Sequence, residues 1–386
     1  MNSKSRILHV IDNTVSGGAQ KQLESIFNGL HGEYSFSVAV LGRVGKYTDI
    51  YKSLGVAVYQ IKRRSNISDV SSFPVLINLI RREKPDLIHA HLFKSMIFSA
   101  LASRFTNTSC ILHDHSGLDP DSLKFYFPNF FFRTLYSSAF QLAISTSTRL
   151  LGLTPEICNG YVQYFHTPES KVEMIPNAID LERLKTYEAS GRMNLRTELG
   201  LADSCKMIVM VGRLAPEKDW LTFLKVAGRN PDPWRYAFVV VGVGGLEKEL
   251  RKTATDLGLA NVHFVGDRQD VPSILKAADL FLLTSSREAF GIVLLEAMAA
   301  DCPVIATRTA GPAAIIQSEN NGLLVEAGDV DGFVTNLGRV LSDANLAARL
   351  IHNARISLQQ YDLPVVSKRL SEIYTQVLKT PGVRLK

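Results

Sequence analysis

The sequence predicts an α/β protein of two Rossmann-like domains, whose parallel sheets face each other across a cleft. Three observations support this fold class. Short apolar, often β-branched runs alternate with helical stretches, and the runs are continuously apolar, as in strands that helices cover on both faces. A series of such alternating runs and helical stretches is found in each half of the chain. The length of 386 residues exceeds that of one ordinary domain.

The predicted strands of the first half are the apolar runs Ile7–Ile11, Phe36–Leu41, Val56–Ile61, Leu87–His91, Cys110–His113, Leu142–Ser145 and Val172–Ile175. Those of the second half are Met207–Val211, Ala237–Val241, Val262–Val265, Leu280–Leu283, Val304–Ala306 and Leu323–Val325. Each run is followed by a loop and a helical pattern, so β–α alternation is predicted throughout.

The domain boundary is predicted near residue 180. Pro176 disfavours helix at Ile175, and the Asn and Asp that follow can turn the chain. This gives domains at 1–180 and 181–360, and a final segment at 361–386. Within that segment, Leu363–Leu378 has the apolar stripe of an amphipathic helix.

Composition excludes several classes of protein. Hydrophobic residues make up 46% and charged residues 21%, as in a globular protein. No apolar run is long enough to span a membrane, and no signal peptide is recognisable, so a cytoplasmic location is expected. The 4 cysteines are scattered, which favours ordinary buried thiols. The net charge of +6 is dispersed, which favours anionic substrates or an acidic lipid surface over nucleic acid.

Glycines and charged residues follow several predicted strands. Gly17 and Gly18 come after the first strand and open a helix, where free N–H groups favour an anion; a tight structural turn is the alternative. Arg213 and Lys218 follow the strand Met207–Val211 and could both reach a diphosphate. Gly244 lies in a glycine loop after the next strand, at the same sheet edge.

Two glutamates follow the strand Leu280–Leu283. Glu288 precedes a predicted helix, and Glu296 lies inside it among apolar residues. A buried carboxylate needs hydrogen-bond donors, which a ribose diol offers, while Glu288 could accept from sugar hydroxyls. The first-turn N–H groups of the helix would face phosphates. A chance surface pair of glutamates is the alternative.

These motifs, taken together and in order, resemble the retaining glycosyltransferases of family 4, which have the GT-B fold. The resemblance covers nearly the whole chain. It rests on five motifs: the early Gly-Gly-Ala, the His-Asp pair at His113, Ile-Pro-Asn-x-x-Asp, Val-Gly-Arg-x-x-x-Glu-Lys, and the two glutamates with seven residues between them.

The resemblance implies a nucleotide-sugar site in the second domain and an acceptor side in the first. Arg213 and Lys218 would hold the donor diphosphate, Glu296 the ribose and Glu288 the transferred sugar. Main-chain amides of Phe290, Gly291, Ile292 and Val293 would assist, and the backbone around Arg268 would contact the base. Gly17 and Gly18 would close over the donor, His113 would contact the sugar, and the final helix would return to the first domain.

The implied reaction transfers a sugar from a nucleotide sugar to a glycan or lipid-linked acceptor in surface polysaccharide or lipopolysaccharide synthesis. A UDP-sugar is the favoured donor, and a GDP-sugar is the second choice. Arg213 and Lys218 would stabilise the leaving diphosphate, so no metal or other cofactor is expected. A nucleotide-sugar epimerase that works without an acceptor, or a non-catalytic sugar-nucleotide-binding protein, are the alternatives.

Two further features leave their interpretation open. His89 and His91 share one face of a strand, but no third metal ligand is evident, so structural histidines are favoured; His115 is a candidate for the acceptor side. The aromatic segment Phe125–Arg133 could begin a core helix. Alternatively, it could be a lipid-facing edge that brings the enzyme to an anionic membrane.

Overall fold

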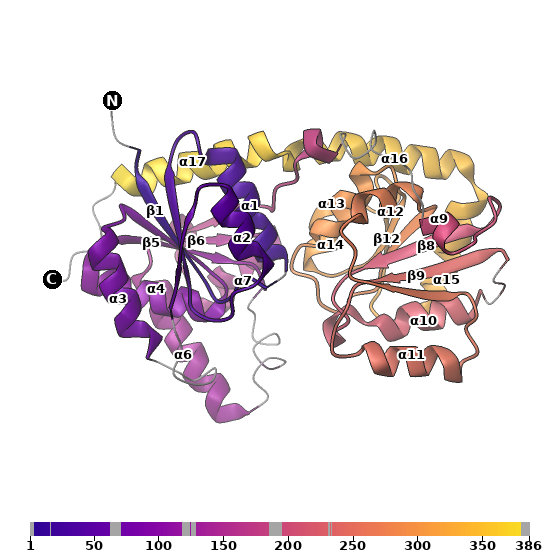
Figure 1. Ribbon diagram of the computed structural model, residues 1–386, viewed down its shortest axis with the longest axis horizontal. Helices are drawn as coiled ribbons and strands as arrows, with labels where there is room; N and C mark the ends of the chain where they lie inside the picture. Colours follow the sequence, from indigo (N-terminus) through magenta and orange to yellow (C-terminus); the bar gives the residue numbers. More distant parts are fainter. Residues whose placement is uncertain are drawn as a thin grey trace. The chain divides into compact units, whose positions relative to one another are not determined.

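The protein consists of two compact units. The computed structural model describes residues 4–15, 17–61, 71–117, 124, 129–184, 195–230, 232 and 234–379. One unit comprises Met1–Ala178 with Leu363–Lys386, and the other comprises Ile179–Asp362. Each contains its own parallel sheet, with helices packed against it (Figure 1). The predicted α/β class with two parallel sheets is therefore confirmed.

The first unit has a seven-stranded sheet in the order β3-β2-β1-β4-β5-β6-β7. Its strands are β1 (Arg6–Ile11), β2 (Ser35–Val40), β3 (Ala57–Gln60), β4 (Leu87–His91), β5 (Ser109–Asp114), β6 (Arg149–Gly152) and β7 (Val172–Met174). Its helices are α1 (Gly18–Leu30), α2 (Lys46–Ser53), α3 (Ser72–Glu83), α4 (Phe93–Thr106), α6 (Phe130–Thr146), α7 (Pro155–Phe165) and α17 (Leu363–Lys379), with the 3-10 turn η1 (Glu169–Lys171).

The second unit has a six-stranded sheet in the order β10-β9-β8-β11-β12-β13. Its strands are β8 (Lys206–Val211), β9 (Tyr236–Val241), β10 (Val262–Gly266), β11 (Leu280–Leu283), β12 (Val304–Thr307) and β13 (Leu323–Val325). Its helices are α9 (Leu195–Glu198), α10 (Trp220–Gly228), α11 (Glu247–Asp256), α12 (Val271–Ala277), α13 (Ile292–Ala299), α14 (Ala310–Ile315), α15 (Val330–Ser342) and α16 (Ala344–Leu358), with the 3-10 turns η2 (Pro216–Lys218) and η3 (Gln359–Tyr361).

One predicted strand is wrong. Leu142–Ser145 belongs to α6, and the strand that pairs with β5 is β6, which comes directly afterwards. The run Leu-Ala-Ile-Ser is short enough to fit either element, and its buried members Ala143 and Ile144 belong to the inner side of α6, together with Phe140. The remaining predicted strands coincide with observed ones within one or two residues.

Helix α17 follows the second unit in sequence but packs on the first. Its apolar stripe, Val366, Leu370, Ile373, Tyr374 and Val377, is buried in the core formed by β1, β4 and α1. Close approach to α1 is possible because Gly29 has no side chain. A Cβ atom there would lie 2.0 Å from the Ser367 hydroxyl oxygen.

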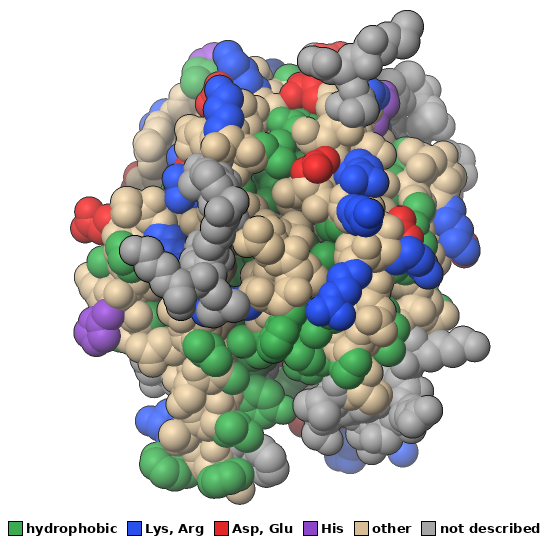
Figure 2. All heavy atoms as spheres, turned by 90° about the vertical axis from the view of Figure 1, so that its left-hand side faces the viewer, with side chains coloured by type: hydrophobic (Ala, Val, Ile, Leu, Met, Phe, Trp, Pro, Cys, Tyr) green, Lys and Arg blue, Asp and Glu red, His purple; other side chains and the backbone are tan. Residues whose placement is uncertain are grey.

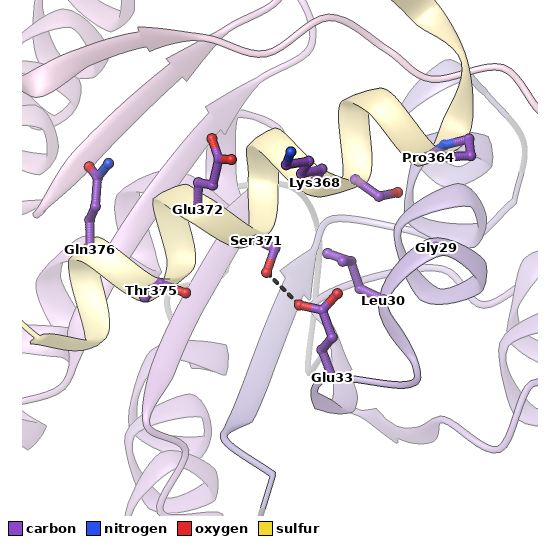
Figure 3. A pocket seen from close by; sticks show the side chains of 10 residues that line it. Gly29, Leu30, Glu33, Pro364, Lys368, Ser371, Glu372, Thr375 and Gln376 are labelled. Atoms are coloured by element: carbon purple, nitrogen blue, oxygen red, sulfur yellow. Dashed lines mark hydrogen bonds between the residues drawn. The ribbon is translucent and has the colours of Figure 1, made fainter.

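A groove of about 630 Å³ runs between α1 and α17 (Figure 3). The Ser371 hydroxyl donates to the Glu33 carboxylate at 2.5 Å beside it, and the Tyr34 hydroxyl donates to the Ser371 carbonyl at 3.2 Å. These contacts join the start of β2 to the middle of α17. The residues that line the groove include none of the predicted site residues.

Among the described residues, no helix combines the length and the hydropathy that a membrane span requires.

Candidate functional site

The strand order of the second sheet reverses direction between β8 and β11. From β8, the chain continues to β9 and β10 on one side, and then crosses to β11, β12 and β13 on the other. Loops that leave the carboxyl ends of two such strands diverge, and ligands of open parallel sheets bind in the crevice between them. Arg213 and Lys218 follow β8, and Glu288 follows β11, so this is the edge where the predicted groups meet.

The loop after β8 presents Arg213 and Lys218 in different environments. The Arg213 side chain is 70% exposed and pairs with Glu217, whereas its carbonyl accepts a 3.0 Å bond from the Trp220 indole. Lys218 ends the short turn η2, and Asp219 then adopts a left-handed conformation and caps α10 through Thr222. The buried indole and the cap fix the loop backbone, while the exposed Arg213 guanidinium would have to exchange its Glu217 partner for a ligand.

An ion pair joins the two loops. The Lys218 ammonium contacts the Glu288 carboxylate, which also accepts a 3.3 Å hydrogen bond from the Ser285 hydroxyl. Both side chains are largely buried, with 19% of Lys218 and 12% of Glu288 exposed. A pair in this setting is less screened than one on the surface, and removing either partner leaves a poorly solvated charge. The structure therefore brings together Lys218 and Glu288, which are 70 residues apart in sequence.

Backbone hydrogen bonds hold these loops together as well. The Arg287 N–H donates to the Glu217 carbonyl at 3.2 Å, and the Ser286 hydroxyl donates to the same oxygen at 3.3 Å. The Thr284 hydroxyl donates to the Asp219 carbonyl at 2.9 Å. The meeting of the two loops thus depends on main-chain contacts as well as on the ion pair.

The glycine loop after β9 lies directly against the loop after β8. A Cβ atom on Gly244 would lie 2.3 Å from the Leu214 carbonyl oxygen and 2.6 Å from its nitrogen. The Leu214 N–H donates to the Val243 carbonyl at 3.1 Å, and the Leu246 N–H donates to the Leu214 carbonyl at 3.1 Å. Gly244 is needed for this close approach, as expected of a glycine where two backbones meet.

The segment from Phe290 to Val293 forms the start of α13. Gly291 precedes the helix in a left-handed conformation, φ +88°, and Phe290 is buried against Tyr361. Ile292 and Val293 open the helix, so their N–H groups have no acceptor within it. Gly311 supports this segment, because its N–H donates to the Glu288 carbonyl at 2.9 Å and a Cβ atom there would lie 2.4 Å from the Phe290 backbone.

Glu296 lies in a different pocket from the ion pair. It is 8% exposed on α13, and it lines a small cavity of about 20 Å³ with residues that include Pro272, Ser273 and Lys276 of α12. The structure thus confirms that this carboxylate is buried. It does not place Glu296 in contact with Lys218 or Glu288, so the ribose role stays a prediction.

Arg268 is held by two acids. Its guanidinium donates to Asp270 at 2.9 Å and to Glu198 at 3.0 Å, and these hydrogen bonds, with Asp270 the stronger influence, raise the pKa of Arg268 further. The side chain therefore anchors the loop after β10 to α9. Contact between the main chain of this loop and a base stays a prediction.

The remaining predicted residues lie in the first unit. Gly17 precedes α1 with φ +145°, and Gly18 is the first residue of that helix. The Gln20 amide nitrogen donates to the Asn13 carbonyl at 3.0 Å. The Gln20 amide oxygen lies so close to Gly17 that a Cβ atom added there would be 2.7 Å from it. His113 has no exposed surface, so contact with a sugar would need a rearrangement after β5. Its predicted role stays untested.

Two acids, one after β8 and one after β1, received no role in the sequence analysis, although Glu217 is part of the Val-Gly-Arg-x-x-x-Glu-Lys motif. Glu217 pairs with Arg213, and its position four residues after that arginine and next to Lys218 was the available signal. Asp12, directly after β1, accepts bonds from the Ser95 N–H at 2.7 Å and from the Ser95 hydroxyl at 2.5 Å at the start of α4. Burial raises the pKa of Asp12, against the opposing effect of these bonds.

Comparison with known proteins gives consistent results for both halves of the chain. Residues 16–183 match the family described as Glycosyltransferase Family 4, and residues 192–357 match the family described as Glycosyl transferases group 1. The chain is 30% identical over 353 residues to the Escherichia coli UDP-Gal:alpha-D-GlcNAc-diphosphoundecaprenol alpha-1,3-galactosyltransferase, covering 88% of this chain and 89% of that protein. It is also 30% identical, over 46% of its length and 53% of the relative's, to the Rhizobium meliloti lipopolysaccharide core biosynthesis glycosyltransferase LpsE.

Solved structures share the fold. The crystal structure of HepE from Anabaena in complex with UDP and glucose superposes with a TM-score of 0.84 at 21% identity, covering 96% of this chain and 100% of that one. WaaG, a glycosyltransferase involved in lipopolysaccharide biosynthesis, superposes with a TM-score of 0.76 at 19% identity, covering 96% and 99%.

Proposed function

The chain belongs to the family 4 glycosyltransferases and has their GT-B fold, and from that premise we propose that it transfers a sugar from a UDP-sugar with retention of anomeric configuration. A GDP-sugar is the second choice of donor. The acceptor is a glycan or a lipid-linked saccharide in surface polysaccharide or lipopolysaccharide assembly, and the enzyme works at the cytoplasmic side of the membrane. The names of the relatives from Escherichia coli and Rhizobium meliloti support this setting.

The observation that supports the proposed chemistry most directly is the Lys218–Glu288 ion pair at the carboxyl ends of β8 and β11. Breaking the bond from sugar C1 to the diphosphate develops negative charge on the leaving oxygen. Lys218 and the exposed Arg213 are the cations proposed to stabilise that charge, and Glu288 keeps the Lys218 ammonium in place before the donor arrives. Transfer then needs no metal ion. We assign no enzymatic nucleophile, and Glu288 serves to position the sugar.

The other predicted contacts complete the donor site. Main-chain N–H groups from Phe290 to Val293 face the phosphates, the Glu296 carboxylate binds the ribose, and the backbone around Arg268 contacts the base. Gly17, Gly18 and His113 are proposed to contact the donor from the first unit. Each of these roles rests on the family resemblance together with the placement described above.

A screen of nucleotide sugars tests the proposal. We expect UDP-galactose, UDP-glucose or UDP-N-acetylglucosamine to raise the melting temperature, with GDP-mannose and ADP-glucose giving smaller shifts, because bound ligand stabilises only the folded state. The Glu296→Ala variant should lose most of the shift. A stabilising shift by GDP-mannose alone would replace UDP by GDP in the proposal.

Product analysis separates the alternatives. Incubation with the stabilising donor and a lipid-diphosphate saccharide, in the presence of EDTA, should give a new glycoside with the anomeric configuration of the donor by NMR. Conversion of the sugar nucleotide to its epimer without acceptor would indicate an epimerase. Binding without turnover towards a panel of acceptors would favour the non-catalytic alternative.

Helix α6 supports the membrane contact in the proposal. Phe130 and Phe131 are 73% and 70% exposed at the start of α6, whereas Phe140, Ala143 and Ile144 further along the helix are buried, so both interpretations of this segment stay open; residues 125–128 lie outside the described residues. Phe131, Leu135 and Leu142 follow helical spacing along one exposed stripe. Figure 2 shows hydrophobic side chains gathered in the lower half of the face that it draws, with Lys and Arg side chains above and beside them. We propose that this stripe contacts an anionic lipid surface.

Liposome flotation checks this contact. We expect the protein to float with phosphatidylglycerol vesicles at low salt and to remain behind with phosphatidylcholine vesicles, because dispersed cations add attraction to anionic lipid. Replacing Phe131 and Leu135 by Ser should reduce the bound fraction several-fold. Trp234→Ser, which removes an aromatic residue of the second unit that is 83% exposed, more than Phe131, is the control and should bind normally. Equal loss in both variants would contradict the role of α6.

A further inference from the structure

Glu217 is an acid at the candidate donor site to which the proposed function gives no role. It lies in the turn η2, directly before Lys218, and only 15% of its side chain is exposed. Its main-chain carbonyl accepts hydrogen bonds from the Arg287 N–H at 3.2 Å and from the Ser286 hydroxyl at 3.3 Å. The loop after β11 therefore holds Glu217 in place through its backbone.

The Glu217 carboxylate is the ion-pair partner of a cation proposed to hold the donor diphosphate. It accepts a hydrogen bond from Nη2 of Arg213, four residues earlier in the chain. The two partners differ in exposure, because 70% of the Arg213 side chain is open to solvent. The carboxylate is thus the enclosed partner, and the guanidinium is the one that a ligand from solvent can reach.

Four charged side chains of these loops compensate one another in pairs. Arg213 pairs with Glu217, and Lys218 pairs with Glu288, so two cations are balanced by two carboxylates. A diphosphate that enters the site therefore meets cations that already have partners. It has to compete with a carboxylate for each of them, because two anions that share one cation repel each other.

The two ion pairs resist this competition to different extents. The Lys218–Glu288 pair is enclosed, and the Ser285 hydroxyl donates a further hydrogen bond to Glu288 at 3.3 Å. The Arg213 guanidinium is exposed, and a pair with a well-solvated partner contributes little to stability. A diphosphate therefore separates the Arg213 pair more readily than the Lys218 pair.

Glu217 is not needed to place the main chain of Arg213. The Trp220 indole donates to the Arg213 carbonyl at 3.0 Å, and the Ala215 N–H donates to the same oxygen at 2.9 Å. These contacts hold the backbone whether or not the guanidinium is paired. What Glu217 adds is a negative charge beside the cation that a diphosphate requires. That charge is weakly screened, because the side chain is largely enclosed.

We propose that Glu217 competes with the donor diphosphate for Arg213 and so limits the affinity of the site for nucleoside diphosphates. This role rests on the proposed function, which assigns the diphosphate to Arg213 and Lys218. On binding, Arg213 exchanges the Glu217 carboxylate for phosphate oxygens, and the enclosed carboxylate is left without its partner. Contacts to the base and the ribose have to offset that loss, so bare phosphate or pyrophosphate binds poorly. After sugar transfer, the return of Arg213 to Glu217 favours release of the nucleoside diphosphate.

Calorimetric titration of the full-length protein with UDP tests this role. In the Glu217→Gln variant, the amide oxygen can still accept a hydrogen bond from Arg213, but the negative charge is gone. We expect this variant to bind UDP about 3- to 5-fold more tightly than the wild type, since an ion pair with one exposed partner contributes a coupling of about that size. Inhibition of sugar transfer by UDP and by inorganic pyrophosphate should strengthen by a similar factor.

Two controls separate competition for Arg213 from other effects. Uridine has no phosphate, so the Glu217→Gln variant should bind uridine with wild-type affinity. Glu319→Gln removes the same charge from another glutamate–arginine pair of the second unit, in which Glu319 accepts bonds of 2.8 and 2.9 Å from Arg339. Glu319 lies between α14 and β13, and we expect its variant to bind UDP as the wild type does.

Several results would overturn the proposal. Unchanged UDP affinity in Glu217→Gln would do so, and weaker binding would mean that Glu217 instead orients Arg213 for the donor. An equal gain in Glu319→Gln, or an equal gain for uridine, would assign the effect to net charge or to a change of loop structure. If the wild type prefers GDP, the same titrations are made with GDP and guanosine. A wild type that binds no nucleoside diphosphate would contradict the proposed function itself, whereas normal wild-type binding without a gain in the variant contradicts only the role of Glu217.

Discussion

Replacing Lys218 by Gln is expected to lower kcat about 100- to 1,000-fold, the usual cost of losing one group that stabilises transition-state charge. The Lys218 ammonium lies in a largely buried ion pair with Glu288, where a glutamine cannot supply the positive charge that the leaving diphosphate requires. Steady-state kinetics with the preferred donor measure the effect. The variant without ligand should melt at a lower temperature, because Glu288 loses its partner. The further rise in melting temperature that UDP produces should be largely kept, because the catalytic loss falls on the transition state.

The control for this experiment is Lys225→Gln. Lys225 is an exposed lysine on α10, seven residues further along the chain, and its removal changes the net charge by the same amount. We expect wild-type turnover in that variant. Wild-type turnover in Lys218→Gln would remove Lys218 from the mechanism, whereas an equal loss in both variants would point to long-range electrostatics.

Replacing Gly244 by Ala is expected to destabilise the protein by about 1–3 kcal/mol and to reduce turnover sharply. The new Cβ atom would lie 2.3–2.7 Å from three backbone atoms of Leu214, which cannot rotate away as a side chain could. The loop after β8, which contains Arg213 and Leu214, would have to move away from the glycine loop after β9. Denaturant unfolding and steady-state kinetics of the same preparation measure both consequences.

The neighbouring glycine provides a matched control. A Cβ atom on Gly245 would meet no atom within 4 Å, and neither glycine has positive φ. Gly245→Ala is therefore expected to change stability by about 0.5 kcal/mol or less. If the two alanine variants unfold at the same denaturant concentration, the close approach of the two loops does not constrain the protein.

The sequence predicted the strands well where apolar runs are continuous, because a strand covered on both faces needs apolar residues at every position. It failed at Leu142–Ser145, where four residues are too few to separate a strand from one turn of a helix. It also left the start of α6 open. The exposure of Phe130 and Phe131 depends on which neighbours pack against the helix, and local composition does not contain that information.

The candidate site was predictable only in part, for a topological reason. Sequence places Lys218 after one strand and Glu288 after another, but it does not say that β8 and β11 are neighbours while β9 and β10 lie on the other side. The family resemblance supplied that link. The same limit applied to the histidines. His89 and His91 visibly share a face, yet His9 joins them only because β1 pairs directly with β4, although β2 and β3 come between them in sequence.

The discontinuity of the first unit has a consequence for biosynthesis. Its core requires Leu370, Tyr374 and Val377 from α17, while the second unit is one uninterrupted stretch, Ile179–Asp362. On the ribosome, the second unit can therefore finish folding before the first, although the first is translated earlier. Until α17 emerges, the apolar face of β1, β4 and α1 that it covers stays open to water.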